Sequence, residues 1–285
     1  MKQITIISGK GGTGKTVITA SFAALADHAV FADCDVDAAN LHLILQPTIK
    51  EQHEFKSGMT AYIDSHRCTR CGKCLSCCRF DAIQPDYMID AVACEGCAFC
   101  SFICPVGAIT MKENISGEWF VSDTRFGPLV HAHLGVAEEN SGKLVSQVRT
   151  KAQEIAEQKK SDLVIIDGAP GIGCPVIASI SGIDLAIVVT EPTLSGLHDA
   201  QRVIRVAQHF NVPVQIVVNK FDLNKSIFKK IQKYCRDNHI EILGGLPFDE
   251  SVVHATVQGK TIIEHGSPLI AQSLRNVWDK IINQW

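Results

Sequence analysis

The chain has 285 residues, of which 46% are hydrophobic and 20% charged, an ordinary composition for a globular protein of about two domains. A net charge of −3 gives no electrostatic basis for binding nucleic acid, and no apolar run approaches the roughly 18 residues of a membrane span. The start of the chain is predicted to be a strand, not a signal peptide. Nine of the twelve cysteines lie between Cys68 and Cys104 at metal-ligand spacing, which predicts a cytoplasmic protein rather than a disulfide-bonded one.

The first motif is the segment Gly9–Thr16, which fits the phosphate-binding pattern G-x-x-x-x-G-K-[ST] in full. A predicted buried strand, Ile4–Ile7, precedes it, and a predicted helix, Val17–Leu25, follows it. The glycines allow backbone N–H groups to face a phosphate without interference from a Cβ atom. Lys15 can reach the β- and γ-phosphates, and the Thr16 hydroxyl can bind Mg²⁺. The residues predicted to bind nucleotide here are Gly11, Gly12, Thr13, Gly14, Lys15 and Thr16.

Lys10, directly after the first glycine, is not required by the general pattern. Its presence makes the loop resemble the deviant Walker A loop of the MinD/ParA/nitrogenase-iron-protein class. In that family the early lysine reaches across a dimer interface to the nucleotide of the partner. The resemblance therefore implies ATP as the nucleotide and a nucleotide-dependent dimer, formed with a second copy or with a paralogue. Lys10 and Lys15 would then both act in catalysis, near the charge that develops on the γ-phosphate.

A second predicted strand, Ala29–Ala32, ends in Asp33-Cys34-Asp35-Val36-Asp37, and Asn40-Leu41 follow shortly. This segment resembles switch I of the same family. Asp35 matches the second aspartate of the pattern, and the resemblance implies that it lies near Mg²⁺ and positions the attacking water. The alternative is a solvated acidic turn, although the end of a strand beside a P-loop is where α/β sites form.

The alternation of strands and helices stops after a short predicted helix, Leu41–Leu45, which ends before Gln46-Pro47. Residues 48–140 depart from that alternation and hold most of the cysteines. We interpret the centre of this stretch as a small inserted domain. The predicted division is an ATPase domain at residues 1–58 and 115–285, with the insertion at residues 59–114.

Eight cysteines of the insertion form two runs with the same spacing, x₂, x₂ and x₃, and the second run ends in Cys104-Pro105. This is the bacterial two-cluster ferredoxin pattern, in which the fourth cysteine of each run binds the other cluster. A zinc ribbon is the alternative, but it needs pairs of cysteines rather than triplets followed by a fourth. The predicted ligands are Cys68, Cys71, Cys74 and Cys104 for cluster 1, and Cys94, Cys97, Cys100 and Cys78 for cluster 2, both [4Fe–4S].

Two features of the first run depart from this pattern. Arg79 stands where the second run has a proline, which removes a backbone restraint, and Cys77 is an extra thiol beside Cys78. The repeat favours Cys78 as the ligand, because the interval from Cys74 to Cys78 equals that from Cys100 to Cys104. We therefore predict that Cys77 is a spare, buried cysteine.

Residues 115–140 are weakly patterned, although Trp119–Val121 and Leu129–Leu134 could pair as a hairpin. His131 and His133 would share one face of such a strand. A metal site is one interpretation. Ordinary structural histidines are the favoured one, since no carboxylate or third ligand lies nearby in the sequence. A helix is predicted from about Ser141 to Lys159.

The ATPase pattern resumes with the apolar segment Leu163–Ile166, followed by Asp167, which together predict a Walker B strand whose aspartate holds Mg²⁺ through water. Ala169–Gly171 resembles switch II of the family. Cys174 follows Asp167 at the spacing at which the nitrogenase iron protein carries a cluster ligand. The sequence offers no clear second cysteine for such a site, so a structural role for Cys174 is the favoured alternative.

Asn219 ends a further predicted strand, Val214–Val218. In the family, an asparagine here binds the adenine edge and a Pro-x-Asp segment walls the base. The resemblance therefore implies that Asn219, Pro247 and Asp249 bind ATP, whereas a simple turn residue is the alternative for Asn219. The last predicted helix, Pro268–Trp285, has an apolar stripe that suits packing on the sheet better than lying on a membrane surface.

The predicted fold is a doubly wound, mostly parallel α/β sheet of the MinD/nitrogenase-iron-protein type, with an inserted α+β bacterial ferredoxin domain. The whole chain resembles MinD-superfamily ATPases that contain such an insertion. This implies an ATPase, slow without a partner, whose nucleotide state gates electron transfer through two [4Fe–4S] clusters to a partner protein. Two alternatives stay open: an ATP-dependent carrier or scaffold in metal–sulfur cofactor assembly, and a positioning ATPase like MinD.

Overall fold

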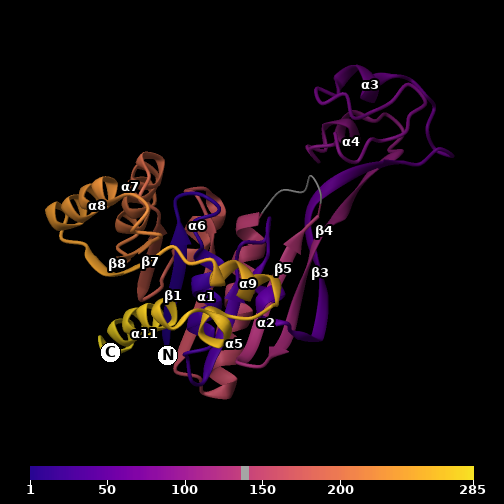
Figure 1. The fold of residues 1–285 in the computed structure, drawn as a ribbon. Coiled ribbons are helices and arrows are strands. Elements are labelled where there is room, and N and C mark those ends of the chain that lie inside the picture. The colour runs from indigo at the N-terminus through magenta and orange to yellow at the C-terminus, as the bar shows by residue number, and fades with distance from the viewer. Residues whose placement is uncertain (136–140) are drawn as a thin grey trace. The chain divides into compact units, whose positions relative to one another are not determined.

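The structure, a computed structural model, describes residues 1–135 and 141–285, and these form two compact units (Figure 1). Unit 1 comprises residues 1–52, 119–133 and 141–285, and unit 2 comprises residues 53–118 with Leu134 and Gly135. Two long strands, β3 (Thr48–Ile63) and β4 (Ile109–Thr124), each pass from one unit into the other. The chain therefore enters and leaves unit 2 along continuous strands.

Unit 1 is built on a sheet with the strand order β3-β4-β5-β2-β6-β1-β7-β8-β9. From β5 to β9 all neighbouring strands are parallel, so the predicted α/β class with a mostly parallel sheet is confirmed. The carboxyl ends of parallel strands meet at one edge of such a sheet, which is where ligand sites form. The remaining strands are β1 (Lys2–Ser8), β2 (Ala29–Asp33), β5 (Gly127–Leu134), β6 (Leu163–Pro170), β7 (Leu185–Thr190), β8 (Val214–Asn219) and β9 (Glu241–Leu246).

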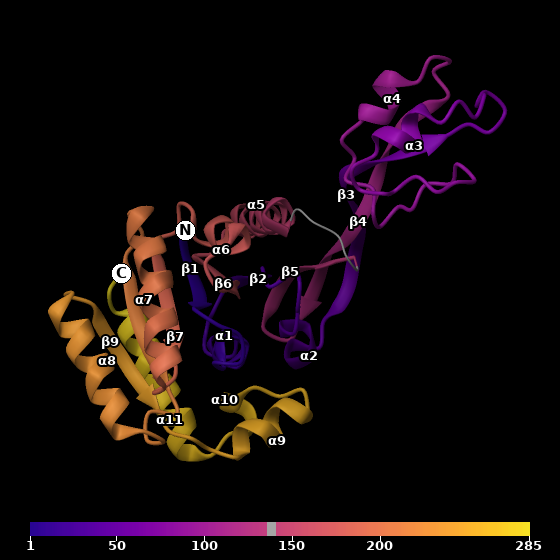
Figure 2. The ribbon, with the colours of Figure 1, turned by 90° about the horizontal axis from the view of Figure 1, so that it is seen from above.

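Helices cover both faces of this sheet (Figure 2). One layer contains α1, α2, α10 and α11, and the opposite layer contains α5, α6 and α7. The predicted helix before Leu163 is present as α5, and the chain alternates strand and helix wherever the sheet is parallel. The bounds are α1 (Lys15–Ala23), α2 (Leu41–Leu45), α5 (Ser141–Lys159), α6 (Cys174–Ile180), α7 (Leu194–His209), α8 (Lys225–Asp237), α9 (Ser251–Val257), α10 (Ile262–His265) and α11 (Pro268–Ile282).

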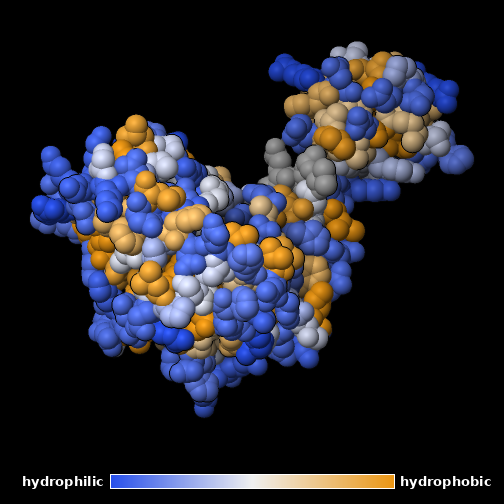
Figure 3. Space-filling model, in the orientation of Figure 1, coloured by the Kyte–Doolittle hydropathy of each residue, from blue (hydrophilic) through white to orange (hydrophobic). Residues whose placement is uncertain are grey.

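The apolar stripe of α11 packs into the core of unit 1, as the sequence predicts. Leu274 and Trp278 are buried against α1, where the rings of Phe22 and Trp278 lie 5.2 Å apart. Burying a side chain such as Phe22 contributes about 1.5–3 kcal/mol to stability. Hydrophilic side chains cover much of the visible face of this unit, with apolar residues in small patches between them (Figure 3). Within the described part of the chain, no helix is both long and apolar enough to cross a membrane.

Arg125, in the turn between β4 and β5, fixes the position of α2. Its guanidinium donates to both carboxylate oxygens of Glu264, at 2.9 and 2.8 Å, and to the carbonyl oxygens of Ile44 and Leu45 at the end of α2. Burial would raise the pKa of Glu264, but hydrogen bonds from Arg125 and Thr261 outweigh it and hold that pKa at about 2. A bidentate, charge-assisted pair of this kind positions both partners firmly.

Unit 2 contains α3 (Lys73–Cys77), α4 (Phe99–Ile103) and the adjoining parts of β3 and β4. Its two cysteine runs fold alike. Gly72 and Ala98, which precede the two helices, both have left-handed backbones, with φ of 76° and 60°. Cys78 and Cys104, which follow them, have φ of −70° and −66° and ψ of 115° and 113°. The repeat in the sequence is therefore also a repeat in the backbone.

Candidate nucleotide site and cysteine cavities

The phosphate-binding loop surrounds a pocket of about 460 Å³ at the carboxyl edge of the sheet. Asp35 and Asn40 line it from the segment after β2, Leu43 and Ile44 from α2, and Thr256 from α9. The sequence analysis did not predict Leu43, Ile44 or Thr256 as pocket residues, because no motif marks a helix that packs beside the loop from elsewhere in the chain. The predicted nucleotide-binding residues that line the pocket are Gly11, Gly12, Thr13, Gly14, Lys15 and Thr16.

Three glycines of the loop, Gly9, Gly12 and Gly14, are required by its geometry. Gly12 and Gly14 have φ of 78° and 90°, where a side chain is strained. A Cβ atom on Gly9 would lie 2.3 Å from the backbone carbonyl of Asp199 in α7, so the loop and that helix can approach only because position 9 has no side chain. These constraints hold the loop open towards the pocket.

The structure places Asn219 against this loop rather than in the pocket lining. Its Nδ2 donates to the carbonyl oxygen of Thr13 at 2.8 Å, and its Oδ1 accepts from the N–H of Lys220 at 3.0 Å. Asn219 therefore anchors the P-loop from the end of β8. An amide has two hydrogens and two lone pairs, so these bonds leave capacity for a base edge, and adenine binding by Asn219 stays a prediction.

Pro247 and Asp249 also lie outside the described lining of the pocket. Asp249 accepts a hydrogen bond from the N–H of Ser251 at 2.8 Å and another from the Ser267 hydroxyl. These bonds from Ser251 and Ser267 lower the pKa of Asp249. Its carboxylate thus joins the beginnings of α9 and α11, a structural role that the sequence did not predict. The walling of the base by Pro247 and Asp249 stays a prediction.

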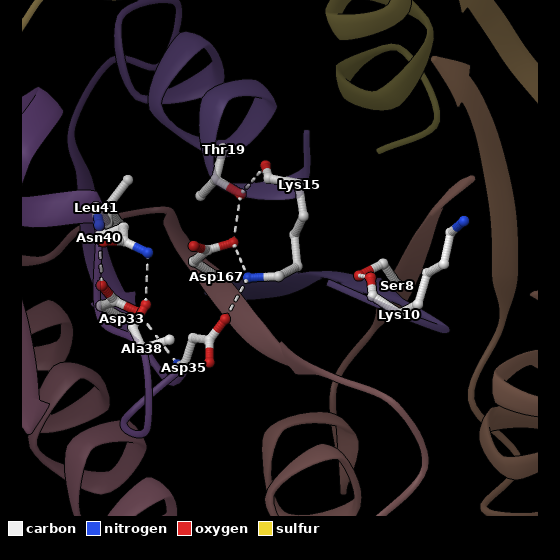
Figure 4. A network of polar contacts seen from close by, with 10 residues as sticks. All are labelled: Ser8, Lys10, Lys15, Thr19, Asp33, Asp35, Ala38, Asn40, Leu41 and Asp167. Atoms are coloured by element: carbon white, nitrogen blue, oxygen red, sulfur yellow. Dashed lines mark hydrogen bonds and ion pairs between the residues drawn. The ribbon is translucent and has the colours of Figure 1, made fainter. Parts of the chain in front are cut away.

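Lys15 forms the centre of the polar network in the pocket (Figure 4). Its Nζ lies 2.9 Å from Asp167 Oδ1 and 3.4 Å from Asp35 Oδ2. Burial would lower the pKa of Lys15, but the charges of Asp167 and Asp35, with Asp33 behind them, outweigh burial and raise it. Lys15 is therefore a cation at neutral pH, and the fold brings it together with both aspartates predicted to act near Mg²⁺.

Asp33 organises the segment that carries Asp35. Its carboxylate accepts the N–H of Asp35 on one oxygen and the N–H of Leu41 on the other, both at 3.1 Å. It lies beside Asp167 in the parallel register of β2 and β6. Complete burial, together with the charge of Asp167, raises the pKa of Asp33 to about 8. Asp33 thus closes the loop from Asp35 to Leu41.

Oxygen donors that suit Mg²⁺ lie in and next to this pocket: Asp35 lines it, and Asp167 lies fully buried in contact with Lys15. Asp167 Oδ2 and Thr13 Oγ1 are buried and have no hydrogen-bond partner among the described residues. A buried carboxylate oxygen without a partner is costly, and Mg²⁺ or its bound water would satisfy it. Thr19 donates to the other oxygen of Asp167 at 3.0 Å and so orients the carboxylate. Lys15 thus pairs with one oxygen of Asp167 and leaves the other without a partner in the part of the chain that the structure describes.

Lys10 points away from the group formed by Lys15, Asp35 and Asp167 (Figure 4). Its Nζ lies 3.2 Å from Ser195 Oγ and 3.9 Å from Glu191 Oε2. The other oxygen of Glu191 accepts from Lys220 at 2.7 Å. Lys10 therefore pairs with Glu191 and not with Asp35 or Asp167, and its reach across a dimer interface stays a prediction.

The predicted cluster ligands line two separate cavities in unit 2. One cavity, of about 20 Å³, is lined by Cys68, Cys71, Cys74 and Cys104. The other, of about 350 Å³, is lined by Cys78, Cys94, Cys97 and Cys100, and also by Cys77. All of these cysteines are free thiols. Each cavity thus gathers one of the two predicted ligand sets, including the fourth cysteine that comes from the other run.

Among the described residues, no group of three or more His, Cys, Asp or Glu is arranged to hold a single metal ion. In a cubane cluster each sulfur binds a different iron, so the four sulfurs do not converge on one point. The smaller cavity, about 20 Å³, has room for about one water molecule, which is less than a cluster would occupy.

His131 and His133 form an aromatic stack with Phe120 and His42. The ring of Phe120 lies 5.0 Å from that of His131 and 5.6 Å from that of His133, and the ring of His42 stacks on His131 at 5.8 Å. The Ser122 hydroxyl pairs with Nε2 of His131 at 3.0 Å. Burial, assisted by the charges of His42 and His133, lowers the pKa of His131 to about 4.

This low pKa predicts that His131 makes unit 1 sensitive to acid. Between pH 6.5 and 4 the unfolded ring binds a proton that the folded ring resists, so the stability it provides is complete above pH 6.5 and falls towards pH 4. Over this pH range, we expect the free energy of unfolding to fall by up to roughly 3 kcal/mol more in the wild type than in His131→Gln. Urea unfolding followed by tryptophan fluorescence measures this, with exposed His28→Gln as control. Equal losses in wild type and His131→Gln would contradict the assignment.

A glycine loop between a strand and a helix, with a buried aspartate at the end of the neighbouring parallel strand, defines a P-loop nucleotide-binding protein. The model of the CobQ/CobB/MinD/ParA nucleotide binding domain matches residues 4–262, and the chain belongs to this family of ATPases. The predicted ATPase activity is thereby confirmed at the level of the family.

The chain is also similar over nearly its whole length to three further proteins. The chain is 35% identical to an uncharacterized protein of Methanocaldococcus jannaschii, over 98% of this chain and 96% of that one. It is 24% identical to an iron-sulfur cluster carrier protein of Pyrococcus abyssi, over 99% and 86% of the two chains. Its fold is similar to that of MinD from Pyrococcus horikoshii complexed with Mg-ADP, with a TM-score of 0.61 and 16% identity over 98% and 95% of the chains.

Proposed function

We propose that this protein is an ATPase whose nucleotide state gates electron transfer through two [4Fe–4S] clusters to a partner protein. The observation that supports this most directly is the pair of cavities in unit 2, each lined by one complete set of four cysteines. When bound, such clusters supply one-electron transfer. A chain that also carries an ATP site has the means to couple the two activities.

The residues of unit 1 have distinct roles in this proposal. The N–H groups of Gly11–Thr16 hold the phosphates, and Lys15 moves from Asp167 to the β- and γ-phosphates. Thr16, Asp35 and Asp167 hold Mg²⁺, and Asp35, the more exposed of the two carboxylates beside Lys15, positions the attacking water. Lys10 acts on the nucleotide of a second subunit, so the active form is a homodimer or a heterodimer with a paralogue.

Helix α2 provides a route from the nucleotide to the strands that enter unit 2. Leu43 and Ile44 line the nucleotide pocket, while His42 on another face of the same helix stacks on His131 of β5. The chain leaves α2 and continues directly into β3. Arg125, at the end of β4, holds the last carbonyl groups of α2. A movement of α2 on nucleotide binding would therefore act on both connecting strands.

Cofactor assembly is the second candidate function. The similarity to an iron-sulfur cluster carrier protein favours it, as does the exposed thiol of Cys97 at the larger cavity. A carrier must release its cluster to an acceptor, whereas an electron-transfer protein must retain it. A positioning role like that of MinD leaves both cysteine cavities without a purpose.

Anaerobic reconstitution tests the proposal. Wild-type protein should bind about eight irons per chain and show a cubane EPR signal on reduction, and Cys68→Ala should lose about half of the iron. Cys235→Ala, which removes a buried thiol of unit 1, is the matched control and should bind the full amount. Stoichiometric zinc without iron would overturn the proposal.

Two further measurements separate the candidate functions. Stopped-flow reduction of the oxidised clusters by dithionite, followed as bleaching of their visible absorbance, should proceed at different rates with ADP and with a non-hydrolysable ATP analogue if the nucleotide gates electron transfer. Incubation with an apo-ferredoxin acceptor should leave the iron on this protein. Transfer of iron to the acceptor, together with equal bleaching rates in both nucleotide states, would favour cofactor assembly instead.

A further inference from the structure

The two cysteine cavities differ in the number of thiols that line them. Cys77 joins the predicted ligands of the larger cavity, whereas the smaller cavity has its four predicted ligands and no additional cysteine. Cys77 is the last residue of α3, and the equivalent last residue of α4 is Ile103. The asymmetry therefore arises at one position of an otherwise repeated backbone.

Cys77 is well placed to reach an iron at this site. It is partly buried, and its thiol donates to the carbonyl oxygen of Cys74 at 3.2 Å, a weak bond that can be given up. Cys77 lines the same cavity as Cys78 and Cys97. Two adjacent residues, Cys77 and Cys78, thus present thiols to the same cavity.

The residue that follows the fourth ligand also differs between the two runs, and it restrains the backbone less after Cys78 than after Cys104. Pro105 follows Cys104 and fixes the dihedral φ at that point, and the sulfur of Cys104 accepts the N–H of Ala108 at 3.3 Å. Arg79 follows Cys78 and imposes no such restraint. The larger volume, about 350 Å³ against about 20 Å³, also leaves more room for a side chain to change its direction.

We propose that Cys77 is an alternative ligand of cluster 2, able to replace Cys78, so that this cluster has two interchangeable fourth ligands and cluster 1 has one. The inference rests on the proposed function. In the exchange, the bond from iron to Cys78 Sγ breaks, a bond to Cys77 Sγ forms, and the proton of the Cys77 thiol passes to Cys78. No oxidant or reductant is needed, because ligand number and oxidation state do not change.

The repeat supplies a matched pair of variants, Cys78→Ala and Cys104→Ala. After anaerobic reconstitution, Cys78→Ala should keep about eight irons per chain and both cubane EPR signals, because Cys77 replaces the missing ligand. Cys104→Ala has no neighbouring thiol and should lose iron from cluster 1. Cys77→Ala alone should keep both clusters, and the double variant Cys77→Ala/Cys78→Ala should lose iron as Cys104→Ala does.

Alkylation of the loaded, folded proteins with iodoacetamide gives an independent measurement. Cys77 should be modified in wild type and protected in Cys78→Ala, as read by mass spectrometry. Equal iron loss in Cys78→Ala and Cys104→Ala, with Cys77 still modified in Cys78→Ala, would overturn the inference. A wild type that binds no iron would overturn the proposed function instead, so the two failures are distinguishable.

Discussion

Replacement of Lys10 with alanine is expected to lower ATP hydrolysis by about 10³–10⁵-fold while leaving ATP affinity nearly unchanged. The side chain points away from the carboxylates of its own site and towards Glu191 and Ser195. A cation placed on the γ-phosphate of another subunit acts like an arginine finger supplied in trans, and it stabilises charge that develops only in the transition state. Dimer formation should fall together with the rate.

Light scattering with ADP and with a non-hydrolysable ATP analogue measures the dimer, and phosphate release measures the rate. Glu191→Gln is the matched control, because it weakens the same ion pair from the other side and leaves the cation in place. This control should dimerise and hydrolyse ATP like the wild type. If Glu191→Gln loses as much activity as Lys10→Ala, the lysine has a local structural role and the model of action in trans is wrong.

Replacement of Asp35 with asparagine should lower the turnover rate by about 10²–10⁴-fold and leave nucleotide binding intact. Asp35 lies 3.4 Å from Lys15 with its side chain 14% exposed, so it can face both the buried network and a water molecule in the pocket. A group that positions water acts on the way to the transition state, and its loss therefore lowers kcat more than it raises KM.

Steady-state kinetics and binding of a fluorescent ATP analogue separate these two effects. Asp37→Asn is the matched control, since it changes an exposed carboxylate of the same segment and should keep turnover within about twofold. Normal turnover in Asp35→Asn would show that another group positions the water and that switch I has been misassigned. Loss of nucleotide binding would show that the contact of Asp35 with Mg²⁺ is essential for binding and would contradict the expected selective loss of turnover.

The resemblance to the family predicted the positions of important residues better than their contacts. Asn219 and Asp249 are both engaged in holding structure together, one on the P-loop and one between the starts of two helices. A motif of three or four residues gives no information on which neighbours will use its polar atoms, because those neighbours come from elsewhere in the chain. Either side chain can bind ATP only in addition to its structural contacts.

The sequence by itself determined the features that depend on a few consecutive residues. The glycine spacing of Gly9–Thr16 specifies a phosphate loop, since its φ values and N–H directions are local. Alternating apolar strands and amphipathic helices specify the α/β class for the same reason. The two cysteine runs share one spacing in the sequence, and their backbones repeat as well.

Only the tertiary structure decided which of these elements meet. Asp167 reaches Lys15 from 152 positions away because β6 lies beside β1, and the direction of Lys10 depends on Glu191 and Ser195, at the end of β7 and the start of α7. The placing of Cys77 in the larger cavity and the stacking of His42 on His131 were likewise set by packing between distant segments. Local propensities fix the backbone of each segment, whereas side-chain partners depend on long-range packing that no short pattern encodes.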